Sequence, residues 1–428
     1  MSTPAASRMS RVDTAWLRMD NDVNLMMIVG VWLLTPAISL ATLRERIETR
    51  LLKYPRFRQK AVLEAMSAHW VDDDAFDLHQ HVVAQPLPRH RGQSERAALQ
   101  QLCGTLAVTP LDPARPLWQF HLVEHYEGGC ALVLRVHHCI ADGIALISVM
   151  NAITDGGSDP PQRRVHAEAD DEGHGDWLSD AVLKPLTDDS PTRLKGKPAG
   201  HKVVAWGEPL PLDVVKVVSK AFNCSINDVL LSCVSGAIGG WLRAQGDDTT
   251  GAEIRAMVPV NLRPLEKAWQ LGNRFGLAPL TLPIGITNPV ERLYAVRARM
   301  AQLKGSYQPL LAFAVLAVSG LFIKPVQDAV LGLFAKKTTA VMTNVPGPAQ
   351  PLKFCGATLR QTMFWVPASG DVGVGVSILS YGGGVQFGLI TDAAMCAEPQ
   401  AIIDRFEPEF QQLLMLSLML PWGDQAAA

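Results

Sequence analysis

A single stretch, residues 130–143, limits the folds open to this chain more than any other. Residues 130–138 are rich in β-forming side chains, and the run 117–124 before them alternates apolar and polar residues. Because the turn Glu127–Gly129 separates the two runs, they predict a β-hairpin. The second strand ends in two adjacent histidines and is followed by an Asp-Gly turn. We therefore expect a fold that delivers an imidazole to the end of a buried strand, ahead of a helix.

The two histidines must face opposite ways, because side chains alternate across a strand. His138 continues a wholly apolar face, formed by every second residue from Leu132, whereas His137 shares its face with Arg135. A neutral imidazole on an apolar wall suits general-base chemistry. We therefore predict that His138 is the catalytic base and that His137 is a supporting neighbour.

A zinc site is the alternative that the local composition leaves open, because further potential ligands lie nearby: His121, His125 and Cys139. The chain has no C-x-x-C and no H-E-x-x-H spacing, so we expect no metal. It also lacks the G-x-S-x-G pattern of a serine nucleophile. A Cys–His nucleophilic pair is not expected either, because Cys139 follows His138 directly and faces the other way.

A second candidate residue lies at the start of the helix predicted over residues 225–244. Ser225 and Asp228 have the spacing of a capping box, which accounts for both side chains. Capping does not account for Asn227, because asparagine is an indifferent helix former. The beginning of a helix also offers free N–H groups to an anion or oxyanion. We therefore single out Asn227 as a second site residue.

The motifs together resemble a known family. The H-H-x-x-x-D-G pattern resembles the active-site signature of the CoA-dependent acyltransferase superfamily, which includes chloramphenicol acetyltransferase and the condensation domains of peptide synthetases. Further segments resemble, in the family's order, the motifs of bacterial wax ester synthase/diacylglycerol acyltransferases (WS/DGAT): Pro110–Trp118, Asn227–Leu231, Val258–Arg263, Leu271–Gly276 and Thr343–Pro348. The resemblance covers the chain from about Met9 to Asp392.

The resemblance implies a mixed α/β fold, with two chloramphenicol-acetyltransferase-like subdomains enclosing an active-site tunnel. It implies an O-acyltransferase that moves a fatty acyl group from acyl-CoA to a long-chain alcohol or to diacylglycerol. Acyl-CoA is then a substrate, no bound cofactor is expected, and His138 acts as general base in a direct ternary complex. Two alternatives stay open: a related acyltransferase with a different hydroxyl acceptor, and a catalytically silent lipid-binding homologue.

The resemblance also assigns roles to individual residues. It makes Asn227 an oxyanion or positioning residue, and it makes Asp142 a structural residue that holds the loop through an arginine. We predict Arg263 as that arginine. Contacts to substrate are predicted for three residues: Gly143, Asp228 and Trp118. The segment that carries Trp118 also fits a turn that proline makes rigid and that packs the indole into the core.

The chain divides near its middle, where residues 155–200 are crowded with Asp, Glu, Gly and Pro. We predict an N-terminal subdomain over residues 1–154 and a C-terminal subdomain over residues 203–428. Residues 155–202 are then a linker or a crossover, with Trp177 as a short anchor within it.

Composition limits the partners. A net charge of −2 over 428 residues offers no basic field for nucleic acid. Seven scattered cysteines and a polar N-terminus favour a reduced, cytoplasmic compartment. The longest apolar run, residues 310–323, is shorter than the roughly 20 residues of a membrane-spanning helix. We expect that run, and the run 413–420, to form core helices or to lie on a membrane or lipid droplet. The protein is expected to be a monomer or a homodimer.

Overall fold

The computed structural model describes residues 6–65, 67–159, 189–263, 270–304, 337–368 and 370–420. They form a mixed α/β fold with two large sheets, one small sheet and flanking helices. The apolar run 310–323 and the residues around Trp177 lie outside the described residues. The expected mixed α/β class is confirmed.

The first large sheet has the strand order β13-β14-β2-β7-β6-β5. Its strands are β2 (Met27–Thr35), β5 (Val82–Ala84), β6 (Trp118–Tyr126), β7 (Gly129–His137), β13 (Lys353–Phe354) and β14 (Ala357–Trp365). Strands β6 and β7 form the predicted hairpin, with Trp118 opposite Val136. Glu127 and Gly128 both have positive φ angles, as the tight turn of a two-residue hairpin loop requires.

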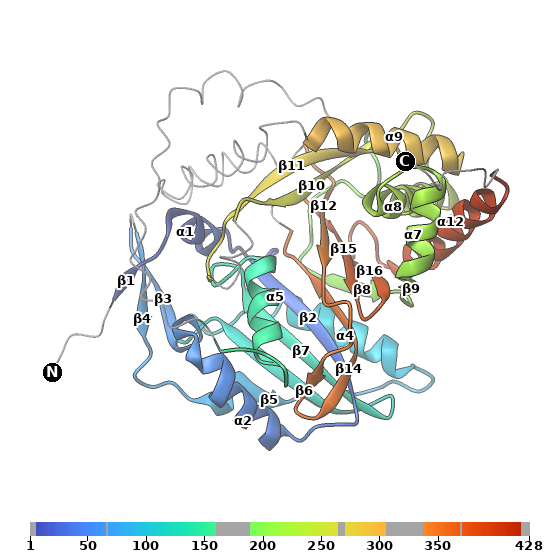
Figure 1. Cartoon of the computed structure of the whole chain (residues 1–428). Helices are drawn as coiled ribbons and strands as arrows, with labels where there is room; N and C mark the ends of the chain where they lie inside the picture. Colours follow the sequence, from blue (N-terminus) through green and yellow to red (C-terminus); the bar gives the residue numbers. More distant parts are fainter. Residues whose placement is uncertain are drawn as a thin grey trace.

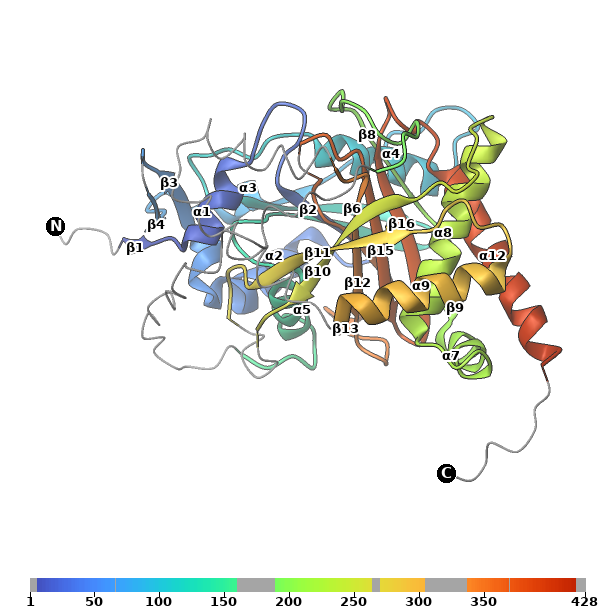
Figure 2. The same ribbon diagram turned by 90° about the horizontal axis from the view of Figure 1, so that it is seen from above.

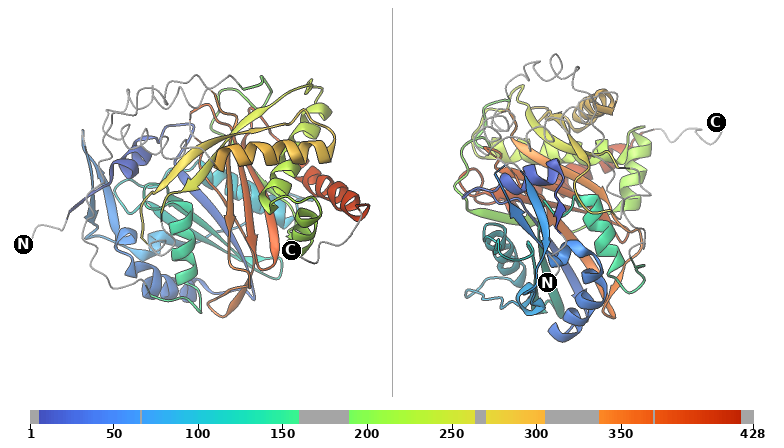
Figure 3. Two further views of the ribbon diagram at one scale, coloured as in Figure 1. Left: turned by 45° about the horizontal axis from the view of Figure 1, so that its top comes forward. Right: turned by 90° about the vertical axis from the view of Figure 1, so that its left-hand side faces the viewer.

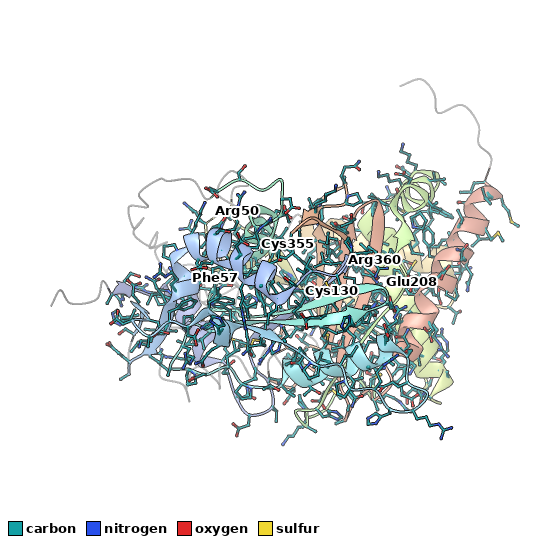
Figure 4. All side chains as sticks on the ribbon, turned by 90° about the horizontal axis from the view of Figure 1, so that it is seen from below. Arg50, Phe57, Cys130, Glu208, Cys355 and Arg360 are labelled. Atoms are coloured by element: carbon teal, nitrogen blue, oxygen red, sulfur yellow. The ribbon has the colours of Figure 1, made fainter. Side chains whose placement is uncertain are left out.

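Residues from both halves of the sequence build this first sheet. Strand β14 pairs antiparallel with β2, although it lies more than 300 residues further along the chain. Seen from below in Figure 4, Cys355 and Arg360 of the β13–β14 hairpin lie beside Cys130 of β7. The sequence patterns did not predict this insertion. The subdomain boundaries expected at residues 154 and 203 stay a prediction.

The second large sheet has the strand order β11-β10-β12-β15-β16-β8, and β9 also pairs with β16. Its strands are β8 (Lys202–Trp206), β9 (Leu210–Pro211), β10 (Ile254–Asn261), β11 (Phe275–Leu282), β12 (Ala340–Pro346), β15 (Val374–Tyr381) and β16 (Gly384–Asp392). A third, small sheet joins β1 (Ser7–Arg8), β4 (Ala68–Asp72) and β3 (Gln59–Leu63).

The helices cover the outer faces of the large sheets. They are α1 (Arg11–Arg18), α2 (Leu40–Arg50), α3 (Leu78–His81), α4 (Glu95–Ala107), α5 (Gly143–Ala152), α7 (Leu212–Ala221), α8 (Ile226–Ala244), α9 (Pro289–Lys304) and α12 (Gln400–Leu418). Figure 1 shows α7, α8, α9 and α12 gathered beside the second sheet, with α2 and α5 beside the first. In Figure 2 the strands of both sheets lie between α1 and α2 on one side and α7, α8 and α12 on the other.

The two faces of β7 enter different cores, as the alternation of its residues predicts. Leu132, Leu134 and Val136 pack into the core under α2 and α5. Ala131 and Val133 pack instead into a core that α4 and β8 share with β2. The face that leads to His138 is therefore apolar along its whole length, and the sequence prediction of that face is confirmed.

Among the described residues, no single helix is long and apolar enough to span a membrane. Helices α7 and α8 reach that length and hydropathy only when they are taken together, and they are bent by 97° relative to each other.

Candidate active site

His138 lies just past the end of β7, in a buried turn. Its backbone N–H donates to the carbonyl oxygen of Met26 at 2.7 Å, and the residue is only 4% exposed. Burial lowers the pKa of His138 from 6.5 to about 4. The imidazole is therefore neutral near pH 7, which is the form that accepts a proton.

The side chain of Asn273 fixes the tautomer of His138. Its amide nitrogen Nδ2 donates to Asp13 Oδ1 and to the His138 carbonyl oxygen, each at 2.7 Å. Because both of these partners are acceptors, the amide oxygen Oδ1 must be the atom that faces His138 Nδ1, at 2.8 Å. Nδ1 therefore carries the proton, and Nε2 keeps its lone pair. No hydrogen bond from the described residues occupies that Nε2 atom.

Aromatic rings hold the plane of the His138 ring. The Trp16 indole of α1 stacks on the imidazole with a centroid distance of 4.1 Å and an interplanar angle of 9°. Phe275 lies at 5.6 Å, tilted by 40°. Together with the Asn273 hydrogen bond, these contacts leave the ring a single orientation.

His137 carries the opposite tautomer. Its Nδ1 accepts the backbone N–H of Cys139 at 3.1 Å, so the proton lies on Nε2. That atom is 3.2 Å from Asp20 Oδ1, and the same carboxylate oxygen accepts the backbone N–H of Met26. His137 thus points away from His138 and helps to hold the start of β2 against the end of β7. The supporting role of His137 in the reaction stays a prediction.

Asp142 and Arg263 form a buried ion pair, the pairing that the family resemblance implies. The guanidinium lies 3.1 Å from Asp142 Oδ2 and 3.3 Å from Oδ1, and the side chains of Arg263 and Asp142 are 2% and 5% exposed. Oδ1 also accepts the N–H of Ala145 and so caps α5, while Oδ2 accepts the N–H of Arg274. Every one of these contacts is internal, so Asp142 holds the loop between β7 and α5 in place.

Residues 270–274, which lead into β11 of the second sheet, pack against this loop, and we call this segment the strap. The β10–β11 hairpin reaches across to α1 and α5, as Figure 3 shows. Gly272 donates its N–H to the Ile140 carbonyl at 3.0 Å and accepts the Asp142 N–H at 3.3 Å. Gly272 has a φ of +99°, and a side chain there would approach the Asp13 carboxylate, so glycine is required. The strap therefore brings Asn273 to His138.

An apolar pocket opens on the same face of β7 as His138. Gly143, the first residue of α5, lines it, and a Cβ atom at Gly143 would meet no other atom within 4 Å. The other lining side chains come mostly from β2, β7, α5, β14 and the segment after β12, and include Ile28, Trp32, Leu134, Val136, Leu146, Ile147, Met150, Pro348, Leu359, Met363, Leu379 and Tyr381. His138 is not among the described residues that line the pocket, but Leu134 and Val136, on the same face of β7, are.

Asn227 and Asp228 lie at the beginning of α8. Asp228 Oδ2 accepts the N–H of Ser225 at 2.8 Å, and the Ser225 hydroxyl accepts the N–H of Asp228, so the predicted capping box is confirmed. Asn227 is exposed, and its Oδ1 accepts from Asn344 Nδ2 at 2.8 Å. No contact between Asn227 and His138 is present among the described residues. The oxyanion role of Asn227 and a substrate contact for Asp228 stay predictions.

Trp118 is packed into the first core and is 1% exposed. Its indole N–H donates to the Phe57 carbonyl at 2.9 Å, and the ring stacks on His81 at 4.5 Å. Trp118 is not among the described residues that line the pocket. These contacts give it a packing role, and its predicted contact with substrate stays a prediction.

The sequence patterns did not identify Asn273 and Trp16, which contact the His138 ring, or Asp13, which holds Asn273. The segment Leu271–Gly276 was recognised as a motif, but nothing in it indicated which side chain reaches the histidine. Asp13 and Trp16 lie in a short N-terminal helix with no local sign of a site. Among the described residues, no group of three or more His, Cys, Asp or Glu side chains could hold a metal ion.

Comparisons with known proteins find sequence matches over most of the chain. A sequence profile described as the wax ester synthase/diacylglycerol acyltransferase catalytic domain matches residues 9–184, and one described as the WS/DGAT C-terminal domain matches residues 271–414. The protein named "Probable diacyglycerol O-acyltransferase tgs1" of Mycobacterium tuberculosis is 25% identical over 422 residues, which cover 89% of each chain.

Solved structures share the fold. The wax ester synthase/diacylglycerol acyltransferase from Marinobacter aquaeolei VT8 superposes with a TM-score of 0.72 at 21% identity, covering 96% of this chain and 100% of that one. The first condensation domain of the CDA synthetase superposes with a TM-score of 0.61 at 14% identity, covering 98% of this chain and 97% of the other. These likenesses confirm the expected fold class.

Proposed function

The chain belongs to the wax ester synthase/diacylglycerol acyltransferase family and is an acyltransferase, and on that basis we propose that His138 is its general base. We propose that it moves a fatty acyl group from acyl-CoA to the hydroxyl of a long-chain alcohol or of diacylglycerol. Acyl-CoA enters as a substrate, and the proposed reaction uses no resident cofactor. The observation that carries the proposal is the neutral, buried His138 with its Nε2 lone pair unoccupied by any described residue.

The proposed reaction is a direct transfer. Nε2 of His138 takes the proton of the acceptor hydroxyl, and the developing alkoxide attacks the thioester carbonyl carbon. A tetrahedral oxyanion forms, and its collapse breaks the C–S bond. The CoA thiolate leaves and takes the proton back from His138. General-base assistance contributes about 10²–10⁴-fold, and binding both substrates side by side contributes more.

The apolar pocket supports long-chain substrates over short ones. Leu134 and Val136 line it, and they belong to the apolar face of β7 that leads to His138. We propose that an alkyl chain in the pocket directs its reactive end toward that residue. Each buried methylene group contributes about 0.8 kcal/mol to binding. A chain of many carbons therefore gains far more from this pocket than a short alcohol does.

The oxyanion needs a hydrogen-bond donor, and Asn227 is our proposed donor. Its Oδ1 is held by Asn344, which leaves its amide N–H groups available. Removing one such donor from an oxyanion site typically lowers kcat by about 10²–10³-fold. Backbone N–H groups near His138 are the other possible donors.

Contact with a membrane or lipid-droplet surface is also part of the proposal. Exposed large apolar side chains gather at the end of α12 and just after it, and they include Met415, Leu418 and Met419. The proposed substrates partition into lipid, so such a patch gives the enzyme access to them.

The test is CoA thiol release by the purified protein. Palmitoyl-CoA is supplied with hexadecanol, with diacylglycerol or with a short alcohol, and His138→Ala is assayed beside the unchanged protein. The proposal requires release that depends on a long-chain acceptor and is lost in the variant. Release that prefers a short or unrelated hydroxyl points to another acceptor class. Lipid binding without any release points to a silent homologue.

A further inference from the structure

The side chain that touches His138 Nδ1 is an amide, and a carboxylate stands behind it. Asn273 lies 135 residues from His138 in the sequence and 260 residues from Asp13. All three are buried: His138 and Asn273 are each 4% exposed, and Asp13 is 2% exposed. The order of contacts is His138, Asn273, Asp13, so the carboxylate reaches the imidazole only through the amide.

Asp13 fixes which way the amide faces. Its Oδ1 accepts the backbone N–H of Asn273 at 3.0 Å and the side-chain Nδ2 at 2.7 Å. A flipped Asn273 would place its own oxygen against the Asp13 carboxylate and the His138 carbonyl, where no hydrogen is available. It would also turn its NH₂ group toward Nδ1 and thereby favour the wrong tautomer of the imidazole.

An amide cannot accept the proton that His138 takes up. The Asp13 carboxylate therefore fixes the orientation of the Asn273 amide, and it does not share the proton that His138 takes up. Burial raises the pKa of the Asp13 carboxyl, and the Arg56 guanidinium partly offsets this effect. The arrangement holds a neutral imidazole, with its lone pair on Nε2.

We propose that Asn273 and Asp13 are positioning residues: Asp13 orients the Asn273 amide, and Asn273 holds His138 in the Nδ1–H tautomer with Nε2 available to the substrate hydroxyl. This inference rests on the proposed role of His138 as the base. It gives α1 and the segment after residue 270 a role in positioning the base, because α1 supplies Asp13 and that segment supplies Asn273.

The experiment reads the tautomer directly. Long-range ¹⁵N–¹H spectra of histidine-labelled protein distinguish Nδ1–H from Nε2–H, and His138→Ala identifies the His138 signals among the 11 histidines. We expect Nδ1–H in the unchanged protein. In Asn273→Ala we expect a mixture or a switch to Nε2–H, with kcat lowered about 10²-fold and KM little changed, because only the base is misplaced.

Two further variants separate orientation from charge. Asp13→Asn keeps an oxygen that accepts from both N–H groups of Asn273, so it should keep the Nδ1–H tautomer and most of kcat. Asp13→Ala removes that acceptor, so this variant should lose both the pure Nδ1–H tautomer of His138 and most of kcat. Gln386→Ala is the matched control, because Gln386 is also 4% exposed and donates to the backbone carbonyl of Gly207, away from His138. It should lose stability but keep the tautomer.

The results can distinguish failure of the positioning inference from failure of the proposed function. An Nε2–H signal for His138 in the unchanged protein overturns the inference without any variant. So does an Asn273→Ala protein that keeps a pure Nδ1–H signal and full kcat. A tautomer that follows Asn273 and Asp13 as expected, in a protein that transfers no acyl group, supports the positioning role and contradicts the proposed function.

Discussion

Arg263 and Asp142 lie 121 residues apart in the sequence and meet as a buried ion pair at the centre of the fold. The guanidinium also donates to the Gly272 carbonyl at 2.8 Å, so one side chain ties the strap to the loop that follows His138. The pair is a structural joint between the two halves of the sequence. Its carboxylate has no free oxygen to offer a substrate.

Asp142→Ala should therefore cost folded protein along with activity. It leaves Arg263 buried without its partner, which costs about 3–5 kcal/mol of unfolding free energy. Urea denaturation followed by circular dichroism measures the loss. Asp213→Ala breaks an exposed pair with Lys216 on α7 and should cost about 1 kcal/mol or less. Normal stability combined with lost activity in Asp142→Ala would contradict a purely structural role.

The pH dependence of acyl transfer should show no acid limb near pH 6.5. Burial lowers the pKa of His138 to about 4, and the imidazole accepts a proton only above its pKa. We expect kcat/KM to stay flat on lowering the pH to about 5 and to fall roughly tenfold per unit below about 4.

The unfolding free energy should also fall as the pH is lowered. The unfolded chain protonates His138 below its ordinary pKa of 6.5 and the folded chain does not, so unfolding free energy falls as the pH drops from 6.5 toward 4. His121, whose pKa burial lowers to about 3, adds to this loss. Circular dichroism at each pH identifies the range in which rates are valid. If kcat/KM instead falls with an apparent pKa near 6.5 while the protein stays folded, the assignment of the buried His138 as the base is wrong.

Gly143→Leu should change the acceptor or acyl chain length that the enzyme prefers. A Cβ atom at Gly143 meets no other atom within 4 Å, and the residue lines the pocket, so we expect the new side chain to extend into the pocket and the fold to survive. It takes up volume that the longest chains would otherwise fill, and excluding even one methylene group from an apolar pocket corresponds to roughly 10–200-fold in kcat/KM. Rates across a series of alcohols and acyl-CoAs measure the shift.

Gly156→Leu is the control for that variant. Gly156 is exposed, and a Cβ atom at this position would also meet no other atom within 4 Å, but Gly156 does not line the pocket. The substitution should leave chain-length preference unchanged. An unchanged preference in Gly143→Leu as well means that the alkyl chains bind elsewhere.

Asn227 can act as a hydrogen-bond donor or as an anchor for Asn344, and two variants distinguish these roles. Asn227→Asp keeps an oxygen for Asn344 but removes the donor, so kcat should fall about 10²-fold if the amide stabilises the oxyanion. Asn344→Ala removes the anchor and should then have little effect. The reverse pattern, an active Asn227→Asp and an inactive Asn344→Ala, assigns Asn227 to holding β12. Steady-state kcat and KM are the measurements.

The exposed end of α12 should contribute to lipid binding. Met415, Leu418 and Met419 are 62%, 59% and 80% exposed, and each gains about 1.5–3 kcal/mol at most when fully buried. Replacing all three by serine should weaken co-sedimentation with phosphatidylcholine vesicles at least roughly tenfold. The same change at Val62 and Leu63, which are exposed on β3, is the control. Equal binding by both variants excludes the α12 patch.

The sequence by itself determined what depends on near neighbours. The alternation along residues 130–138 placed His138 on the apolar face of β7, and the spacing of Ser225 and Asp228 marked the beginning of α8. These features follow from strand and helix periodicity and from capping, which act over a few residues.

Only the tertiary structure decided what covers His138. Local patterns specify the face that a side chain takes, but they do not specify which distant segment packs on that face. Asn273 reaches the imidazole because the β10–β11 hairpin crosses to α1, and Asp13 reaches Asn273 because α1 packs beneath it. Likewise β14 enters the first sheet because its edge and apolar face fit β2, a pairing across more than 300 residues that no local signal encodes.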